Sequence, residues 1–132
     1  MKYLLDTNTC IYLIKEKTTV CTQRIQSMRI NEIGISTITF AELEYGVSKS
    51  SLPEKNKLAL LKFVAPLEIL SFTARAAQTY GQIRAYLEKS GQIIGSLDLV
   101  IGSHAKSENL ILVTNNVSEF SRIADLNIEN WV

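Results

Sequence analysis

Short apolar runs alternate along this chain with longer stretches that have helical periodicity. The apolar runs at residues 2–5, 33–36, 67–72 and 110–113 are bounded by polar or turn residues, which is typical of buried strands. A last strand is predicted near residues 127–131. Because strands that alternate with helices form βα units, the pattern predicts a parallel sheet covered on both faces. The expected fold class is α/β, a three-layer α/β/α sandwich with a short parallel sheet.

The stretches between these runs have the apolar spacing of helices. Helices are predicted over residues 10–28, 40–48, 53–64, 74–89 and 97–108, with a helical turn over 117–122. The first helix is expected to break near Thr18 and Thr19, Pro53 suits a first helical turn, and Gly91 suits a helix end. No repeat, linker or low-complexity tract divides the sequence. Residues 1–132 are therefore expected to form a single domain.

Composition narrows the class of protein. Apolar residues make up 46% and charged residues 20% of the chain, which indicates a globular protein. The apolar runs are far shorter than the roughly 20 residues of a membrane span, and Asp6 interrupts the N-terminal run too early for a signal peptide, so a cytoplasmic location is expected. The net charge of +1 argues against non-specific coating of nucleic acid. Local basic runs, such as Arg75, Arg84 and Lys89, are more simply interpreted as solvated helix faces.

Four acidic residues occupy related places in the predicted fold. Asp6 ends the first strand, Glu42 lies in the first turn of the helix after the second strand, and Glu119 follows the fourth strand. Asp98 lies in the first turn of the helix that leads into the fourth strand. Because the carboxyl ends of parallel strands gather at one edge of a sheet, these acids are expected to meet there.

Helix capping is the alternative explanation for each acid taken alone. Thr39 and Glu42 fit a capping box, and Ser96 is a plausible N-cap before Asp98. Asn116 and Glu119 nearly fit a capping box, and Asp6 could cap the helix that follows it. Capping explains why an acid lies in a first turn. It does not explain why several first turns face the same edge of one sheet.

Converging carboxylates require a counter-charge. Two carboxylates about 4 Å apart repel by roughly 4 kcal/mol at an effective dielectric near 20, so a cluster stays ionised only around a cation or else takes up protons. An all-oxygen set without a histidine cluster favours Mg²⁺ or Mn²⁺ over Zn²⁺. Such ions suit phosphodiester or phosphoryl hydrolysis by metal-activated water. The lone His104 is interpreted as a packing residue, and there is no glycine-rich phosphate loop.

Five segments, spread over nearly the whole chain, carry a resemblance to a known family. They are Leu5-Asp6-Thr7-Asn8 with Ile11-Tyr12, then residues 35–46, 95–105, 112–120 and 128–131. Taken together they resemble the PIN-domain ribonucleases, and more narrowly the VapC-type toxins of bacterial type II toxin–antitoxin systems. The resemblance implies an endoribonuclease that depends on Mg²⁺, with Mn²⁺ as a substitute.

The resemblance also assigns expected roles. Asp6 and Asp98 would be the metal ligands, and Glu42 and Glu119 would complete the acidic catalytic set. The groups expected to orient water, ligands or phosphate are Thr7, Asn8, Thr114 and Asn116. Many family members carry an aspartate at the place of Asn116, so the fourth role at the site falls to either Glu119 or Asn116. The missing charge at Asn116 is expected to weaken a second metal site more than the first.

Partners follow from the same resemblance. It implies a VapB-like antitoxin whose tail covers the active site, a homodimer of the toxin, and operator DNA bound only through the antitoxin. The expected substrate is RNA, either tRNA or another structured RNA, and no membrane is involved. Two other functions remain open from the residues: a non-catalytic PIN-like binding or co-repressor module, and a metal-dependent phosphatase that acts on small molecules.

Overall fold

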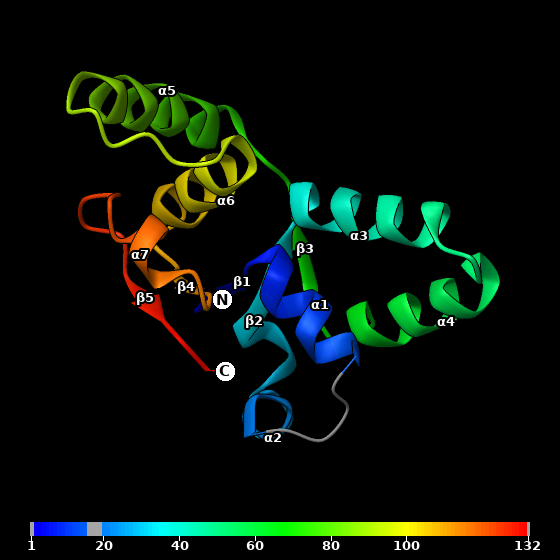
Figure 1. Ribbon diagram of the computed structural model, residues 1–132. Helices are drawn as coiled ribbons and strands as arrows, with labels where there is room; N and C mark the ends of the chain where they lie inside the picture. The colour runs from blue at the N-terminus through cyan, green and yellow to red at the C-terminus, as the bar shows by residue number, and fades with distance from the viewer. Residues whose placement is uncertain (1, 16–19, 132) are drawn as a thin grey trace.

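Among the residues that the structure describes, 2–15 and 20–131, five parallel strands form one sheet (Figure 1). In this computed structural model the strands are β1 (Tyr3–Leu5), β2 (Ile33–Ser36), β3 (Glu68–Leu70), β4 (Ile111–Val113) and β5 (Ile128–Glu129). Their order across the sheet is β3-β2-β1-β4-β5, and every neighbouring pair is parallel. The predicted α/β class with a parallel sheet is confirmed. Because β1 is central, the residue that follows it lies in the middle of one sheet edge.

Helices cover both faces of this sheet. Figure 1 shows α1, α3 and α4 on one side and α5, α6 and α7 on the other. The bounds are α1 (Thr7–Lys15), α2 (Val20–Gln26), α3 (Thr37–Lys49), α4 (Pro53–Val64), α5 (Ala74–Lys89), α6 (Ser96–Ser107) and α7 (Val117–Phe120), with a short 3₁₀ turn at Ile30–Glu32. The helices predicted over 53–64 and 74–89 have those bounds. The predicted break near Thr18 and Thr19 lies outside the described residues.

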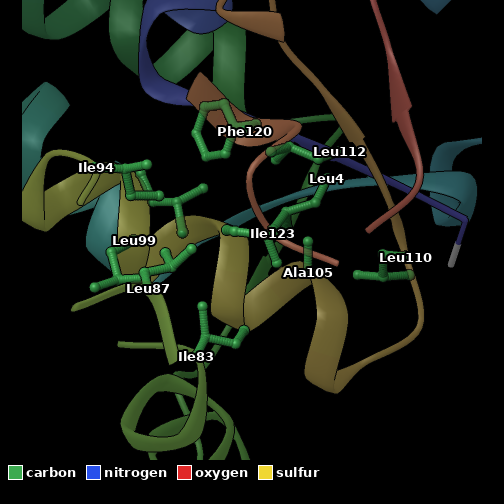
Figure 2. Close-up of a cluster of buried hydrophobic side chains, with 11 residues drawn as sticks. Leu4, Ile83, Leu87, Ile94, Leu99, Ala105, Leu110, Leu112, Phe120 and Ile123 are labelled. Atoms are coloured by element: carbon green, nitrogen blue, oxygen red, sulfur yellow. The ribbon is translucent and has the colours of Figure 1, made fainter. Parts of the chain in front are cut away.

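Alternation along β1 creates two separate cores. Tyr3 and Leu5 point to the face that α1, α3 and α4 cover, whereas Leu4 points to the opposite face. On that opposite face Leu4 joins a fully buried cluster with Phe120 and Leu112, which Figure 2 shows beside the turns of α6. All three residues of β1 are buried, as expected of a central strand with helices on both sides.

Two predicted helix caps differ from the structure, and the helix predicted from residue 10 begins at Thr7. Helix α3 begins at Thr37, and the Ser36 side chain caps it by accepting a hydrogen bond from the Ile38 amide at 3.1 Å. Thr39 therefore lies inside the helix, and the predicted capping box that begins there is wrong. Helix α6 is preceded by Gly95, which has no side chain to cap it, so the prediction of Ser96 as N-cap is also wrong. Within the described residues, every helix is too short or too polar to cross a bilayer.

Candidate active site

Each of the four predicted acids lies beside a buried apolar residue that fixes its place in the fold. The neighbour packs in one of the two cores, and the acid consequently projects from the end of a strand or the beginning of a helix. The pairs are Asp6 with Leu5, Glu42 with Leu43, Asp98 with Leu99, and Glu119 with Phe120.

Asp6 is the most enclosed acid, with only 2% of its surface exposed. Its Oδ1 accepts a hydrogen bond from the Thr9 amide at 2.8 Å, so Asp6 caps α1 as the local explanation predicted. Its Oδ2 accepts a hydrogen bond from the Thr114 hydroxyl, at the end of β4. Among the described residues no Lys or Arg forms an ion pair with Asp6. The carboxylate is therefore held by one donor from the first turn of α1 and one from the end of β4.

Glu42 projects from α3 toward the beginning of α1. The Thr7 hydroxyl donates a hydrogen bond to Glu42 Oε1 at 2.7 Å, and Thr7 Oγ1 lies 3.2 Å from Thr39 Oγ1. The sequence predicted Glu42 in the first turn of its helix. Because α3 starts at Thr37, Glu42 lies in the second turn instead. The longer helix places Glu42 directly beside the residue that follows Asp6.

Asp98 and Glu119 share one hydrogen-bond donor. The Asn116 side-chain amide donates to Glu119 Oε2 at 2.9 Å and to Asp98 Oδ2 at 3.3 Å. The other oxygen of Glu119 accepts a hydrogen bond from the Gly95 amide, just before α6. The side chain of Asn116 makes no capping hydrogen bond to α7, so the near capping box with Glu119 is not formed. The amide instead separates two carboxylates that face each other.

The pKa of Asp98 is raised by its surroundings, which include the other three acids. Burial is the largest cause that raises this pKa above its ordinary value. The charges of Glu119 and Asp6 raise it further, and the charge of Glu42 adds a smaller effect. The hydrogen bond from Asn116 acts in the opposite direction. Asp98 thus lies within electrostatic reach of the other three carboxylates.

Glu119 responds differently because it is hydrogen-bonded and less enclosed. The Gly95 amide and the Asn116 side chain hold the pKa of Glu119 below its ordinary value, and the positive charge of Arg122 contributes in the same direction. Two adjacent acids therefore have pKa values displaced in opposite directions, which is common at functional sites. The sequence alone predicts no role for Gly95. A Cβ at this position would lie 3.3 Å from Glu119 Oε1, so a glycine lets the backbone approach the carboxylate.

The donor chemistry of this cluster fits a hard divalent cation. As the side chains stand, the described residues contain no group of three His, Cys, Asp or Glu side chains arranged to hold one metal ion. Mg²⁺ does not need such a cage, since it is commonly held by one or two carboxylates together with waters and substrate phosphates. The donors that gather at this edge are carboxylate, amide and hydroxyl oxygens, the ligand type that Mg²⁺ prefers.

A groove leads from the acids between three helices. It has a volume of about 660 Å³ and is lined by residues of α1, α3 and α4, with Glu42 and Asp98 at its acidic end. Thr7 and the exposed Asn8 also line it, as do apolar residues such as Ile11. The site therefore opens into a partly apolar channel that is large enough for a peptide segment.

His104 lies outside the acid cluster. Its ring is fully buried and packs edge-on against Phe72, with the ring centroids 5.4 Å apart. Its Nδ1 is 2.9 Å from the Ser36 hydroxyl that caps α3, and burial lowers the pKa of the imidazole. This arrangement agrees with the interpretation of His104 as a packing residue.

Comparison with known proteins agrees with this geometry. Residues 3–126 match the PIN domain family. The chain is 47% identical over 132 residues to ribonuclease VapC2 of Rickettsia felis, with 99% of this chain and 98% of that protein covered. It is 41% identical over 131 residues to the tRNA(fMet)-specific endonuclease VapC of Shigella flexneri, with 99% and 98% covered.

Solved structures show the same fold. The chain superimposes with a TM-score of 0.94 on a chain of the Rickettsia felis VapBC2 complex bound to a promoter DNA fragment, at 46% identity and 100% coverage of both chains. For the DNA-bound VapBC complex of Salmonella typhimurium the TM-score is 0.96 at 42% identity, with 100% of this chain and 99% of that chain covered. The chain belongs to the PIN-domain family and, within it, to the VapC-type ribonucleases.

Proposed function

We propose that this protein is a divalent-metal-dependent endoribonuclease, with Mg²⁺ or Mn²⁺ as its cofactor, and that it acts as the toxin of a toxin–antitoxin pair. The observation that carries the proposal is the hydrogen-bonded arrangement of the acids at one edge of the sheet. Thr114 binds Asp6 and the Asn116 backbone amide, and the Asn116 side chain binds both Asp98 and Glu119. Glu42 is joined to this edge through Thr7, which follows Asp6. None of the four carboxylates forms an ion pair within the described residues, so the cluster favours a cation. A bound divalent cation would supply an activated water and neutralise phosphate charge.

Asp6 and Asp98 are the metal ligands in this proposal, with Glu42 and Glu119 as further acidic groups of the catalytic centre. Contacts within the chain position each of them. The Thr114 hydroxyl and the Thr9 amide fix the Asp6 carboxylate. Thr7 orients Glu42, and the Asn116 amide keeps Asp98 and Glu119 apart. Asn8, exposed at the rim, is suited to contact a substrate phosphate.

The proposed substrate is tRNA or another structured RNA, cut within a single-stranded loop. Such loops are favoured because their bases can be splayed out of the stack and expose the backbone. Relatives from Shigella flexneri and Salmonella typhimurium, 41% and 43% identical to this chain, are named tRNA(fMet)-specific endonucleases, which supports the same class of substrate here. Attack by water in line with the leaving oxygen would leave a 5′-phosphate and a 3′-hydroxyl.

The proposed partner is a VapB-like antitoxin whose tail occupies the groove between α1, α3 and α4. The groove reaches Glu42 and Asp98, so a basic side chain of the tail would meet the acids there. Relatives solved as VapBC complexes with DNA support this partner, and they also support binding of operator DNA through the antitoxin. We propose a homodimer of the toxin within that complex.

The test is cleavage of tRNA by the purified protein with Mg²⁺ and with EDTA. Cleavage is expected only with Mg²⁺, and Asp6→Asn and Asp98→Asn are each expected to abolish it. The control is Glu54→Gln, which removes an exposed carboxylate from the first turn of α4 and should leave the rate unchanged. Cleavage by Asp6→Asn at the rate of the unmodified protein would refute the proposed site. Turnover of p-nitrophenyl phosphate without turnover of tRNA would indicate a phosphatase, and turnover of neither would indicate a binding module.

A further inference from the structure

A second groove, with a basic rim, lies on the other side of the sheet from the groove between α1, α3 and α4. It has a volume of about 400 Å³ and lies between one face of α5, the end of α6 and the segment after α7. We call it the basic groove. Its floor is apolar, and its polar rim includes Arg75, Lys106, Arg122 and Tyr86.

The cations of the basic groove have no carboxylate beside them in the groove itself. The lining includes no carboxylate, and none of the three cations takes part in an ion pair in the part of the chain that the structure describes. Lys106 Nζ donates to the Ala124 carbonyl at 2.7 Å, and Arg122 Nη1 donates to the Ile93 carbonyl at 2.8 Å. These bonds hold the two head groups in place without neutralising them. A neighbouring cation on α5, Arg84, lies outside the groove and pairs with Glu88 at 3.2 Å.

The basic groove begins next to the acid cluster. The charge of Arg122 reaches Glu119, and the Ile93 carbonyl that Arg122 contacts lies two residues before Gly95, whose amide binds Glu119. From there the groove extends to the far end of α6. Lys106 follows Asp98 by eight residues on this helix, about 12 Å at about 1.5 Å per residue. A chain of phosphates that leaves the acids along α6 would therefore pass the groove.

Tyr86 adds an aromatic surface to this rim. Its side chain is 61% exposed although it is a large, partly apolar ring. Proteins that bind single-stranded nucleic acid combine a positive groove that follows the backbone with exposed aromatic rings on which bases stack. The basic groove has both the positive charges and the exposed ring, and the residues that carry them line the same groove from α5, α6 and the segment after α7.

We propose that the basic groove binds the single-stranded RNA that flanks the cleaved bond, with phosphates at Arg75, Lys106 and Arg122 and a base stacked on Tyr86. This inference rests on the proposed ribonuclease function and adds a second contact region for its substrate. Charge complementarity favours RNA over an apolar partner. The acid cluster repels a polyanion and the net charge of the chain is only +1, so local uncompensated cations are needed to hold RNA beside the acids.

Binding is measured first, in EDTA, with a fluorescein-labelled single-stranded RNA and fluorescence anisotropy. The variant is the double substitution Arg75→Ala with Lys106→Ala, which keeps Arg122 because its charge also reaches Glu119. Each phosphate contact on a single strand contributes about 0.7 to the slope of log Kd against log salt, so the double variant should lower the slope by about 1.4 and weaken binding about 25-fold near 0.1 M salt. Arg84→Ala removes a paired cation from the same helix and should change neither quantity.

The stacking contact has its own pair of variants. Tyr86→Ala should weaken binding by about 5- to 150-fold, the range that corresponds to loss of one stacked base. Tyr86→Phe keeps the ring and should bind like the unmodified protein. Equal losses in both variants would refute stacking, since only the hydroxyl differs between phenylalanine and tyrosine.

Cleavage separates this inference from the proposed function. With Mg²⁺, kcat/KM of the unmodified protein should rise as the RNA is lengthened to span the distance from the acids to Lys106, and the double variant should lose that rise. Absence of any RNA cleavage by the unmodified protein would refute the proposed function, while the binding assay in EDTA would still decide the groove. Unchanged binding by the double variant would overturn the inference. If the double variant also changed its oligomeric state in sedimentation, the basic groove would be assigned to contact with a second copy of the chain.

Discussion

Asp98→Asn should stabilise the metal-free protein while it abolishes activity. Folding raises the pKa of Asp98 above its unfolded value near 3.8, so the folded chain binds this proton more tightly than the unfolded chain does. The free energy of unfolding that this group contributes therefore falls as the pH rises above about 3.8. At neutral pH the Asp98 charge destabilises the fold, and an uncharged side chain of the same shape removes that cost.

The magnitude follows from the distances at Asn116. Its amide nitrogen lies 3.3 Å from an oxygen of Asp98 and 2.9 Å from an oxygen of Glu119, so those two oxygens are no more than about 6 Å apart. At 6 Å the repulsion is about 2.8 kcal/mol at a dielectric near 20 and about 0.7 kcal/mol at the dielectric of water. Because Glu119 is only partly buried, we expect a value near the lower limit, about 1 kcal/mol. For 132 residues this corresponds to a rise in Tm of about 4 °C.

The assay is thermal unfolding followed by circular dichroism in EDTA, at pH 7 and again below pH 3.8. The stabilisation should be present at pH 7 and disappear at the lower pH, where the aspartate is protonated. The control is Asp125→Asn, which removes an exposed carboxylate at a residue whose φ of 63° asparagine also tolerates. A Tm at pH 7 that stays the same or falls in Asp98→Asn would refute the electrostatic reasoning.

Three further variants test individual contacts. Glu119→Gln should reduce cleavage of tRNA less than Asp98→Asn does, because Glu119 is the more solvated acid, and an equal loss of kcat would show that this ranking is wrong. Ser36→Ala removes both the cap of α3 and the partner of His104, so urea unfolding should show a loss of about 2 kcal/mol, and a loss below about 0.5 kcal/mol would contradict this role. Thr7→Val removes the donor to Glu42 and should lower kcat about tenfold with an unchanged circular dichroism spectrum; an unchanged kcat would mean that this hydrogen bond has no part in orienting the acid.

The strands and the position of Asp6 could be predicted from the sequence, because the local apolar pattern matches the burial of these residues in the fold. Apolar runs revealed the strands, and Asp6 follows the first of them at the middle of the sheet edge. The alternation of elements was sufficient to predict a parallel sheet, because only helical crossovers return the chain to the same edge. The proximity of Asp6, Glu42, Asp98 and Glu119 follows from that topology.

The start of α3 was harder to predict, because its first residues are Thr37, Ile38 and Thr39. Branched side chains lower helix propensity, so the pattern favoured a later start. In the structure Ser36 caps the helix and His104 lies against that cap, a contact between residues 68 positions apart. The shared donor at Asn116 was also beyond sequence analysis, because it depends on the distance between α6 and the end of β4.

The central position of β1 has a consequence for synthesis of the protein on the ribosome. A chain that has just emerged contains Asp6, but the strand that carries it must wait for β4 to fill its second side, and Glu119 is translated 113 residues later. No partial product contains the full set of acids in place. The complete acidic site therefore forms only when nearly the whole polypeptide has been produced.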